Sequence, residues 1–142
     1  MKNYHELIPG KVYMGAAGDM QDAVDQDRVE VIVDLRAEAT KCAAKGDGVQ
    51  WIQVPLGDNS PTTEAPLFKE AIEAVVGAMH AGKRVAFHCG QGRGRTGTVA
   101  AGVLLELGEA KSVDEAETLS QAVRPQLQMQ SVQREALRSL YR

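Results

Sequence analysis

The chain has 142 residues, of which 44% are hydrophobic and 25% charged, and its formal net charge is -3. These values are ordinary for a soluble globular protein, and we expect one domain over residues 1–142 with its own hydrophobic core. A slightly acidic chain has no general attraction for nucleic acid or anionic membranes, so neither is expected as a partner. No apolar run is long enough to span a membrane, and residues 1–6 lack the apolar core of a signal peptide.

Cysteine and histidine usage indicates a reducing compartment and no metal site. The two cysteines, Cys42 and Cys89, are too few for a disulfide framework. A reversible disulfide between them is one hypothesis, and an ordinary free Cys42 is the simpler one. The three histidines form no cluster with carboxylates at metal-ligand spacing. We therefore expect a cytoplasmic protein that uses no cofactor.

Hydrophobic periodicity predicts alternating strands and helices along the chain. Strands are expected at residues 11–14, 31–35, 51–54 and 84–88. Helices are expected at residues 19–28, 66–80, 98–107, 112–123 and 131–140. The alternation predicts an α/β fold, a single-domain sandwich with a central, mainly parallel sheet flanked by helices. Loop 57–65, rich in turn-forming residues, is the best candidate for a mobile active-site segment.

The most informative segment is residues 88–97, with the sequence HCGQGRGRTG. A predicted strand precedes it and a predicted helix follows, so a glycine-rich loop leads into a helix N-terminus. Backbone N–H groups converge at such a place and the helix dipole is positive there, so the loop is suited to binding phosphate. The same surroundings, with an arginine close by, favour the nucleophilic thiolate form of a cysteine.

The pattern HCxxGxxRTG of residues 88–97 resembles the signature of the cysteine-dependent protein tyrosine phosphatases, and of their small dual-specificity branch in particular. Further similarity to that branch covers nearly the whole chain, at residues 8–15, 31–36, 51–58, 112–116 and 123–125. The resemblance implies a phosphotyrosine phosphatase-like fold. It also implies hydrolysis of phosphotyrosine, and of phosphoserine or phosphothreonine, in proteins through a phosphocysteine intermediate.

The resemblance assigns roles within the loop. Cys89 is expected to attack phosphorus, and Arg95 to hold two equatorial oxygens with its planar guanidinium group. The remaining loop residues are expected to bind the substrate phosphate, and they are Gly90, Gln91, Gly92, Arg93 and Gly94. The lack of a Cβ at Gly92 and Gly94 lets the backbone turn its N–H groups inward. The alternative role for such an arginine is that of a solvated surface side chain, and Arg93 fits that role better than Arg95.

Three residues around the loop complete the expected site. Thr96 is expected to donate to the Cys89 sulfur and so help it leave, with capping of the following helix as an alternative. His88 is expected to support the loop by hydrogen bonding. Asp58 is expected to protonate the leaving oxygen and then activate water. The alternatives are a turn-forming role for Asp58, or Glu64 as the acid.

For two further pairs of residues, the sequence leaves two alternative roles open. Gln130 and Gln133 lie where related enzymes carry glutamines that position water, but the spacing departs from the family pattern and solvated glutamines fit equally well. Asp34 and Arg36, at the end of a predicted strand, would either support the phosphate loop or pair with each other.

The glycines of residues 92–97 also match a dinucleotide-binding fingerprint, which needs an acidic residue at the end of a following strand. However, residues 112–122 are predicted to be helical, with Ser112 as N-cap and Glu115 closing a capping box. A Walker loop is excluded because no Lys-Ser or Lys-Thr follows the last glycine.

Three classes of function remain after these exclusions. They are a protein phosphatase, a phosphatase of inositol phosphates, phosphoinositides or another small phosphoester, and an inactive phosphopeptide-binding module. Lipid-directed relatives carry two basic residues inside the loop, whereas this chain has only Arg93, which favours protein substrates mildly. The presence of Cys89, Arg95 and Asp58 argues against an inactive module.

Overall fold

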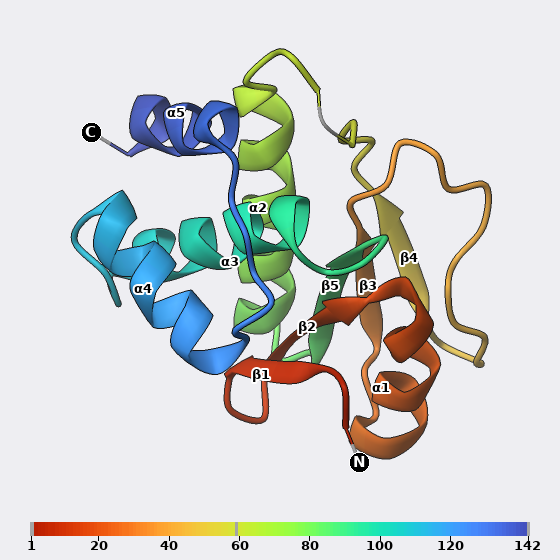
Figure 1. Cartoon of the computed structure of the whole chain (residues 1–142). Helices are drawn as coiled ribbons and strands as arrows, with labels where there is room; N and C mark the ends of the chain where they lie inside the picture. Colours follow the sequence, from red (N-terminus) through yellow and green to blue (C-terminus); the bar gives the residue numbers. More distant parts are fainter. Residues whose placement is uncertain (1, 59, 142) are drawn as a thin grey trace.

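The computed structural model describes residues 2–58 and 60–141, and a five-stranded sheet lies at its centre (Figure 1). The strands are β1 (His5–Ile8), β2 (Val12–Ala16), β3 (Val31–Asp34), β4 (Gln50–Gln53) and β5 (Val85–Cys89). Their order across the sheet is β1-β2-β5-β3-β4. Only the β1–β2 hairpin is antiparallel in the described sheet, so the expected mainly parallel sheet is confirmed.

Helices cover both faces of this sheet (Figure 1). The helical segments are η1 (Ala17–Asp19), α1 (Met20–Asp27), α2 (Ala65–His80), α3 (Gly94–Glu106), α4 (Val113–Val123) and α5 (Ser131–Leu140). Helix α1 lies against one face, while α2 to α5 gather on the other. None of the helices in the described part of the chain is long and apolar enough to cross a membrane.

The central strand β5 contributes to two hydrophobic cores. Val85 and Phe87 pack in the larger core beneath α2 to α5, whereas Ala86 packs in the smaller core beside α1. This alternation follows from the pleat of a strand, which sends successive side chains to opposite faces. Because both faces are covered, the central strands are buried and mainly apolar, with His88 in β5 and Asp34 in β3 as buried polar residues, and Cys89 stands at the carboxyl end of β5.

Helix α3 begins at Gly94, earlier than the expected start at Thr98. Glycine has low helix propensity, so Gly94 and Gly97 made this first turn look like loop in the sequence. Packing overrides that preference, because every residue from 95 to 104 is buried. The early start places Arg95 in the first turn of the helix, immediately after the loop that follows β5.

Helix α4 follows where a dinucleotide-binding fold would need a strand, so that alternative is wrong. Its N-terminus is capped as expected, because the Ser112 hydroxyl accepts a hydrogen bond from the Glu115 N–H at 3.1 Å. The Glu115 carboxylate, however, accepts from the Lys111 N–H at 2.8 Å instead of reaching back to Ser112. The expected capping box is therefore shifted by one residue.

Candidate active site

The loop between β5 and α3 turns its carbonyl groups away from the site. All four carbonyls of residues 90–93 accept hydrogen bonds from groups outside that segment. Their donors include the backbone N–H groups of Ala17 and Gln128 and the guanidinium group of Arg124. In contrast, no backbone N–H of residues 90–95 donates to another group of the described chain. This set of free N–H groups at a helix N-terminus forms an anion-binding nest.

Arg124 supports this loop from behind. Its side chain is buried, and its Nε donates to the Gly92 carbonyl at 2.9 Å. Its Nη1 donates to the Asn3 carbonyl at 2.8 Å and lies 3.0 Å from His5 Nδ1. Burial lowers the pKa of Arg124, yet an arginine stays charged at neutral pH. Sequence analysis missed this contact because its partners are main-chain carbonyls far away in the chain.

Two loop glycines are required for different reasons. Gly92 has a φ of +70°, and a Cβ there would lie 2.6 Å from the Gly15 carbonyl oxygen. The φ of Gly94 is not positive. A Cβ at Gly94 would instead lie 3.3 Å from Oε1 of Gln133. A left-handed backbone turn therefore requires glycine at Gly92 only, and not at both positions as expected. Gly94 instead leaves space for the side chain of Gln133.

The Cys89 sulfur lies at the base of this nest and is almost completely buried. The Thr96 hydroxyl donates a hydrogen bond to it at 3.0 Å. Thr96 lies inside α3, whose N-cap is Arg93, so the alternative of a capping role for Thr96 is wrong. A donor at this distance stabilises negative charge on sulfur.

Arg95 is buried and is held on one edge by Glu38. Its Nη1 and Nη2 donate to the two Glu38 carboxylate oxygens at 2.9 and 3.0 Å, and Nη1 also donates to the Leu56 carbonyl at 3.0 Å. Burial opposes the charge on Arg95, but Glu38 and the Cys89 sulfur outweigh it and raise the pKa of Arg95. The hydrogen bond from Arg95 lowers the pKa of Glu38. The Nε–H edge remains available for a phosphate oxygen.

His88 supports the loop from within the sheet and is completely buried. Its Nδ1 lies 2.9 Å from the Cys89 carbonyl, which can only accept, so Nδ1 carries the proton. Burial lowers the pKa of His88 and favours the neutral ring. Asp34 lies 3.8 Å from His88 Nε2 and accepts from Arg36 and from Trp51 Nε1. Asp34 and Arg36 therefore pair with each other, whereas His88 Nε2 has no hydrogen-bond partner among the described residues.

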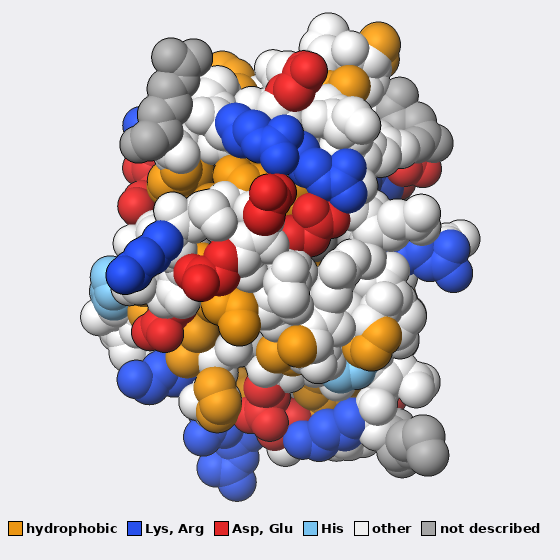
Figure 2. Space-filling view, turned by 60° about the vertical axis from the view of Figure 1, so that its left-hand side comes forward, with side chains coloured by type: hydrophobic (Ala, Val, Ile, Leu, Met, Phe, Trp, Pro, Cys, Tyr) orange, Lys and Arg blue, Asp and Glu red, His pale blue; other side chains and the backbone are white. Residues whose placement is uncertain are grey.

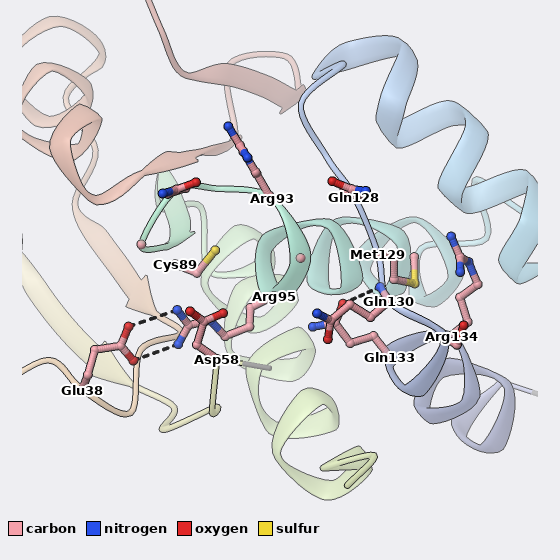
Figure 3. Close-up of a pocket in the computed structure, with 14 residues that line it drawn as sticks. Glu38, Asp58, Cys89, Arg93, Arg95, Gln128, Met129, Gln130, Gln133 and Arg134 are labelled. Atoms are coloured by element: carbon pink, nitrogen blue, oxygen red, sulfur yellow. Dashed lines mark hydrogen bonds and ion pairs between the residues drawn. The ribbon is translucent and has the colours of Figure 1, made fainter. Parts of the chain in front are cut away.

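A cavity of about 910 Å³ opens over the loop, and Asp58 lines it together with Cys89 (Figure 3). Asp58 is exposed, and Figure 3 shows it beside the guanidinium group of Arg95. Glu64 is not among the described residues that line the cavity. Its carboxylate accepts from the Gly57 N–H at 3.2 and 3.3 Å and so closes the base of the loop that carries Asp58. The geometry therefore favours Asp58 over Glu64 as the acid; Asn59 in this loop lies outside the described residues.

The opposite wall of the cavity carries the two glutamines that sequence analysis left open. Gln133 is buried, so the solvated alternative is wrong for it, and its Oε1 accepts from the Gln130 N–H at 2.9 Å. Gln130 is exposed but also lines the cavity. Gln128 is a third amide on this wall, whereas Gln126 is not among the described lining residues.

The second cysteine and the acidic side chains lie apart from the loop of residues 88–97 in the sequence. Cys42 is a free, half-buried thiol that packs against the smaller core. In residues 2–58 and 60–141, no group of three or more His, Cys, Asp or Glu side chains could hold a metal ion.

Comparison with known proteins identifies the family. The family model described as the dual specificity phosphatase catalytic domain matches residues 12–142. The chain belongs to this family. It is therefore a phosphatase of the dual-specificity class, and residues 88–97 lie within the matched region. A search of curated proteins gave no match to the sequence.

Solved structures of such phosphatases share the fold of this dual-specificity phosphatase domain. Human DUSP28 superposes with a TM-score of 0.83 at 18% identity, covering 98% of this chain and 93% of that chain. DUSP15 gives a TM-score of 0.85 at 16% identity, covering 99% and 88%. PTPMT1 in complex with PI(5)P gives 0.77 at 18% identity, covering 98% and 94%. At these identities the likeness shows a common fold.

Proposed function

We propose that this dual-specificity phosphatase hydrolyses phosphomonoesters through a covalent phosphocysteine intermediate. The observation that carries the proposal is the loop itself, in which the N–H groups of residues 90–95 donate to no group of the described residues and the Cys89 sulfur lies at its base. A phosphate group held by those N–H groups and by the Nε–H edge of Arg95 would present its phosphorus to the sulfur.

Two displacements at phosphorus complete the reaction. In the first, the Cys89 thiolate forms the S–P bond while the P–O bond to the leaving group breaks, and Asp58 gives its proton to that oxygen. In the second, water attacks phosphorus and gives a proton back to the Asp58 carboxylate, while the S–P bond breaks. The Thr96 hydroxyl, 3.0 Å from the sulfur, stabilises the departing thiolate.

Phosphotyrosine, phosphoserine and phosphothreonine in proteins are the substrates that the family implies. A small polar phosphoester, such as an inositol phosphate or a phosphoinositide headgroup, is the second candidate. The amide side chains of Gln128, Gln130 and Gln133 along the cavity favour it, because they can bind hydroxyl groups. A thiolate nucleophile needs a reducing environment, so we propose that the protein works in the cytoplasm.

Substitution of the two cysteines tests the proposal. Cys89→Ser should abolish turnover of an aryl phosphate while inorganic phosphate still binds, because the loop N–H groups and Arg95 remain. Cys42→Ser makes the same change outside the site and should keep wild-type turnover. Both measurements are made in EDTA, in which the wild-type enzyme should remain active. Turnover by the Cys89 variant near the wild-type rate would contradict the cysteine mechanism.

A further inference from the structure

We propose that the preferred substrate is a polyol that carries at least two phosphates, and that Arg93 binds the phosphate that is not cleaved. This inference rests on the proposed function, because it requires one phosphate to occupy the loop above Cys89. It names the class of leaving group and a second anion-binding position on the rim of the same cavity.

Among the described residues that line the cavity, Arg93 is the cation without an ion-pair partner. Its side chain is exposed, and it makes no ion pair within the described residues. The other two cations of the lining are both paired with carboxylates. Arg95 is paired with Glu38 at 2.9 Å, and Arg134 with Glu117 at 2.8 Å. An additional anionic group on a substrate would therefore find an uncompensated positive charge at Arg93.

Charge is distributed unequally around the cavity. Glu38 and Asp58 line the side formed after β3 and β4, and Figure 3 shows Arg93 leaving the loop in the direction away from both. Gln91 and Gln128 also belong to the lining and offer amide N–H donors. A second phosphate would find no unpaired cation on the side of Glu38 and Asp58, because Arg95 there is paired with Glu38, and would be attracted on the side of Arg93. The site thus selects one orientation of a bisphosphorylated substrate.

The walls of the cavity are polar. Among the described lining residues there is no aromatic side chain, and the apolar side chains are Met129, which is buried, and Cys89 itself. A phosphotyrosine ring gains affinity from apolar or aromatic walls, which this cavity does not offer. The hydroxyl groups of a polyol can instead bind the amides of Gln128, Gln130 and Gln133.

Among the described residues outside the cavity, few exposed hydrophobic side chains could hold the flanking residues of a peptide. Leu119 on α4, 42% exposed, is the large hydrophobic residue that the described chain leaves exposed, and it does not line the cavity. On the face drawn in Figure 2, hydrophobic side chains are dispersed among charged and polar ones. A cavity of about 910 Å³ is large for a single phosphate and lies in the range of small-molecule sites.

A comparison of substrates on the wild-type enzyme and three variants tests this inference. The substrates are myo-inositol monophosphates and bisphosphates, vesicles of phosphatidylcholine with a phosphatidylinositol bisphosphate, and phosphotyrosine and phosphothreonine peptides. The variants are Arg93→Gln, Arg93→Lys, and Arg138→Gln, which removes an exposed arginine of α5 outside the cavity. Turnover of an aryl phosphate by the wild-type enzyme, measured in parallel, tests the proposed function separately.

The inference predicts that wild-type kcat/KM is at least about tenfold higher for a bisphosphate than for a monophosphate, as one charge-assisted contact allows. Arg93→Gln should reduce that ratio to near one, Arg93→Lys should retain part of it, and Arg138→Gln should retain all of it. Preference for the soluble bisphosphate or for the vesicles supports the inference and identifies the source of the headgroup. An unchanged ratio in Arg93→Gln, or a higher kcat/KM for the peptides, overturns it even if the aryl phosphate is hydrolysed.

Discussion

The contact between Glu38 and Arg95 gives the most specific prediction about how Arg95 binds a phosphate. Glu38 accepts from both Nη atoms of Arg95, so it fixes the plane of the guanidinium group before any phosphate binds. Glu38→Gln removes the negative charge and one acceptor oxygen but keeps the shape of the side chain. The remaining carbonyl contacts of Arg95, to Leu35 and Leu56, cannot fix that plane because both involve Nη1.

The expected loss follows from the burial of the two partners. Breaking a fully buried ion pair costs about 3–5 kcal/mol, whereas exposed pairs contribute about 0.2–1 kcal/mol. The side chain of Arg95 is 4% exposed and that of Glu38 is 54% exposed, so solvent screens one partner only. We therefore expect an intermediate loss of about 1–2 kcal/mol, or roughly 5- to 30-fold in kcat/KM.

Steady-state kinetics on an aryl phosphate, together with urea unfolding, measure this effect. Glu117→Gln is the matched control, because Glu117 makes a similar two-oxygen pair with Arg134, at 2.9 and 2.8 Å, away from the nucleophile. Glu38→Gln should lower kcat/KM well beyond any loss in the control. Equal losses in the two variants would refute a positioning role for Glu38. An increase in kcat/KM would show that Glu38 competes with phosphate for Arg95.

Three further predictions concern the loop and the acid. Arg95→Lys should lower kcat by about 10²–10³, because one of two planar donors is lost, while Arg138→Lys outside the cavity should match wild type. Asp58→Asn should lower kcat little on p-nitrophenyl phosphate and up to about 10²–10⁴ on an alkyl phosphate, and an equal loss on both would indicate a structural role. Because burial lowers the pKa of His88 in the folded state, neutral His88 contributes stability above its unfolded pKa of about 6.5, and this is lost as pH falls toward the folded pKa. Urea unfolding of His88→Asn should therefore show a weaker fall in stability from pH 7 to pH 5 than wild type, and identical slopes would contradict the assignment.

The fold and the centre of the site were predictable because their signals are local. Short apolar runs in the sequence predict the parallel strands. The motif of residues 88–97 places Cys89, Thr96 and Arg95 in one strand–loop–helix unit. The start of α3 was misplaced, since two glycines hid a first turn that packing stabilises.

Residues that act through distant partners were not predictable. Glu38 is an exposed acid in an irregular loop, and only the three-dimensional structure brings its carboxylate to Arg95. Arg124 was part of a recognised segment, but its contacts are carbonyl groups of Gln91 and Gly92, which leave no pattern in the sequence. Gln133 could not be separated from its neighbouring glutamines until its burial against the loop was known.

Trapping the intermediate tests the central proposal most directly. The wild-type enzyme is mixed with an aryl phosphate labelled on phosphorus, quenched in acid within one turnover, digested and analysed by mass spectrometry. The mechanism predicts one phosphate per chain, bound to the sulfur of Cys89, that forms and decays at rates compatible with kcat and is absent from Cys89→Ser. Release of product within one turnover with no phosphate bound to Cys89, or with phosphate bound to another residue, would contradict it.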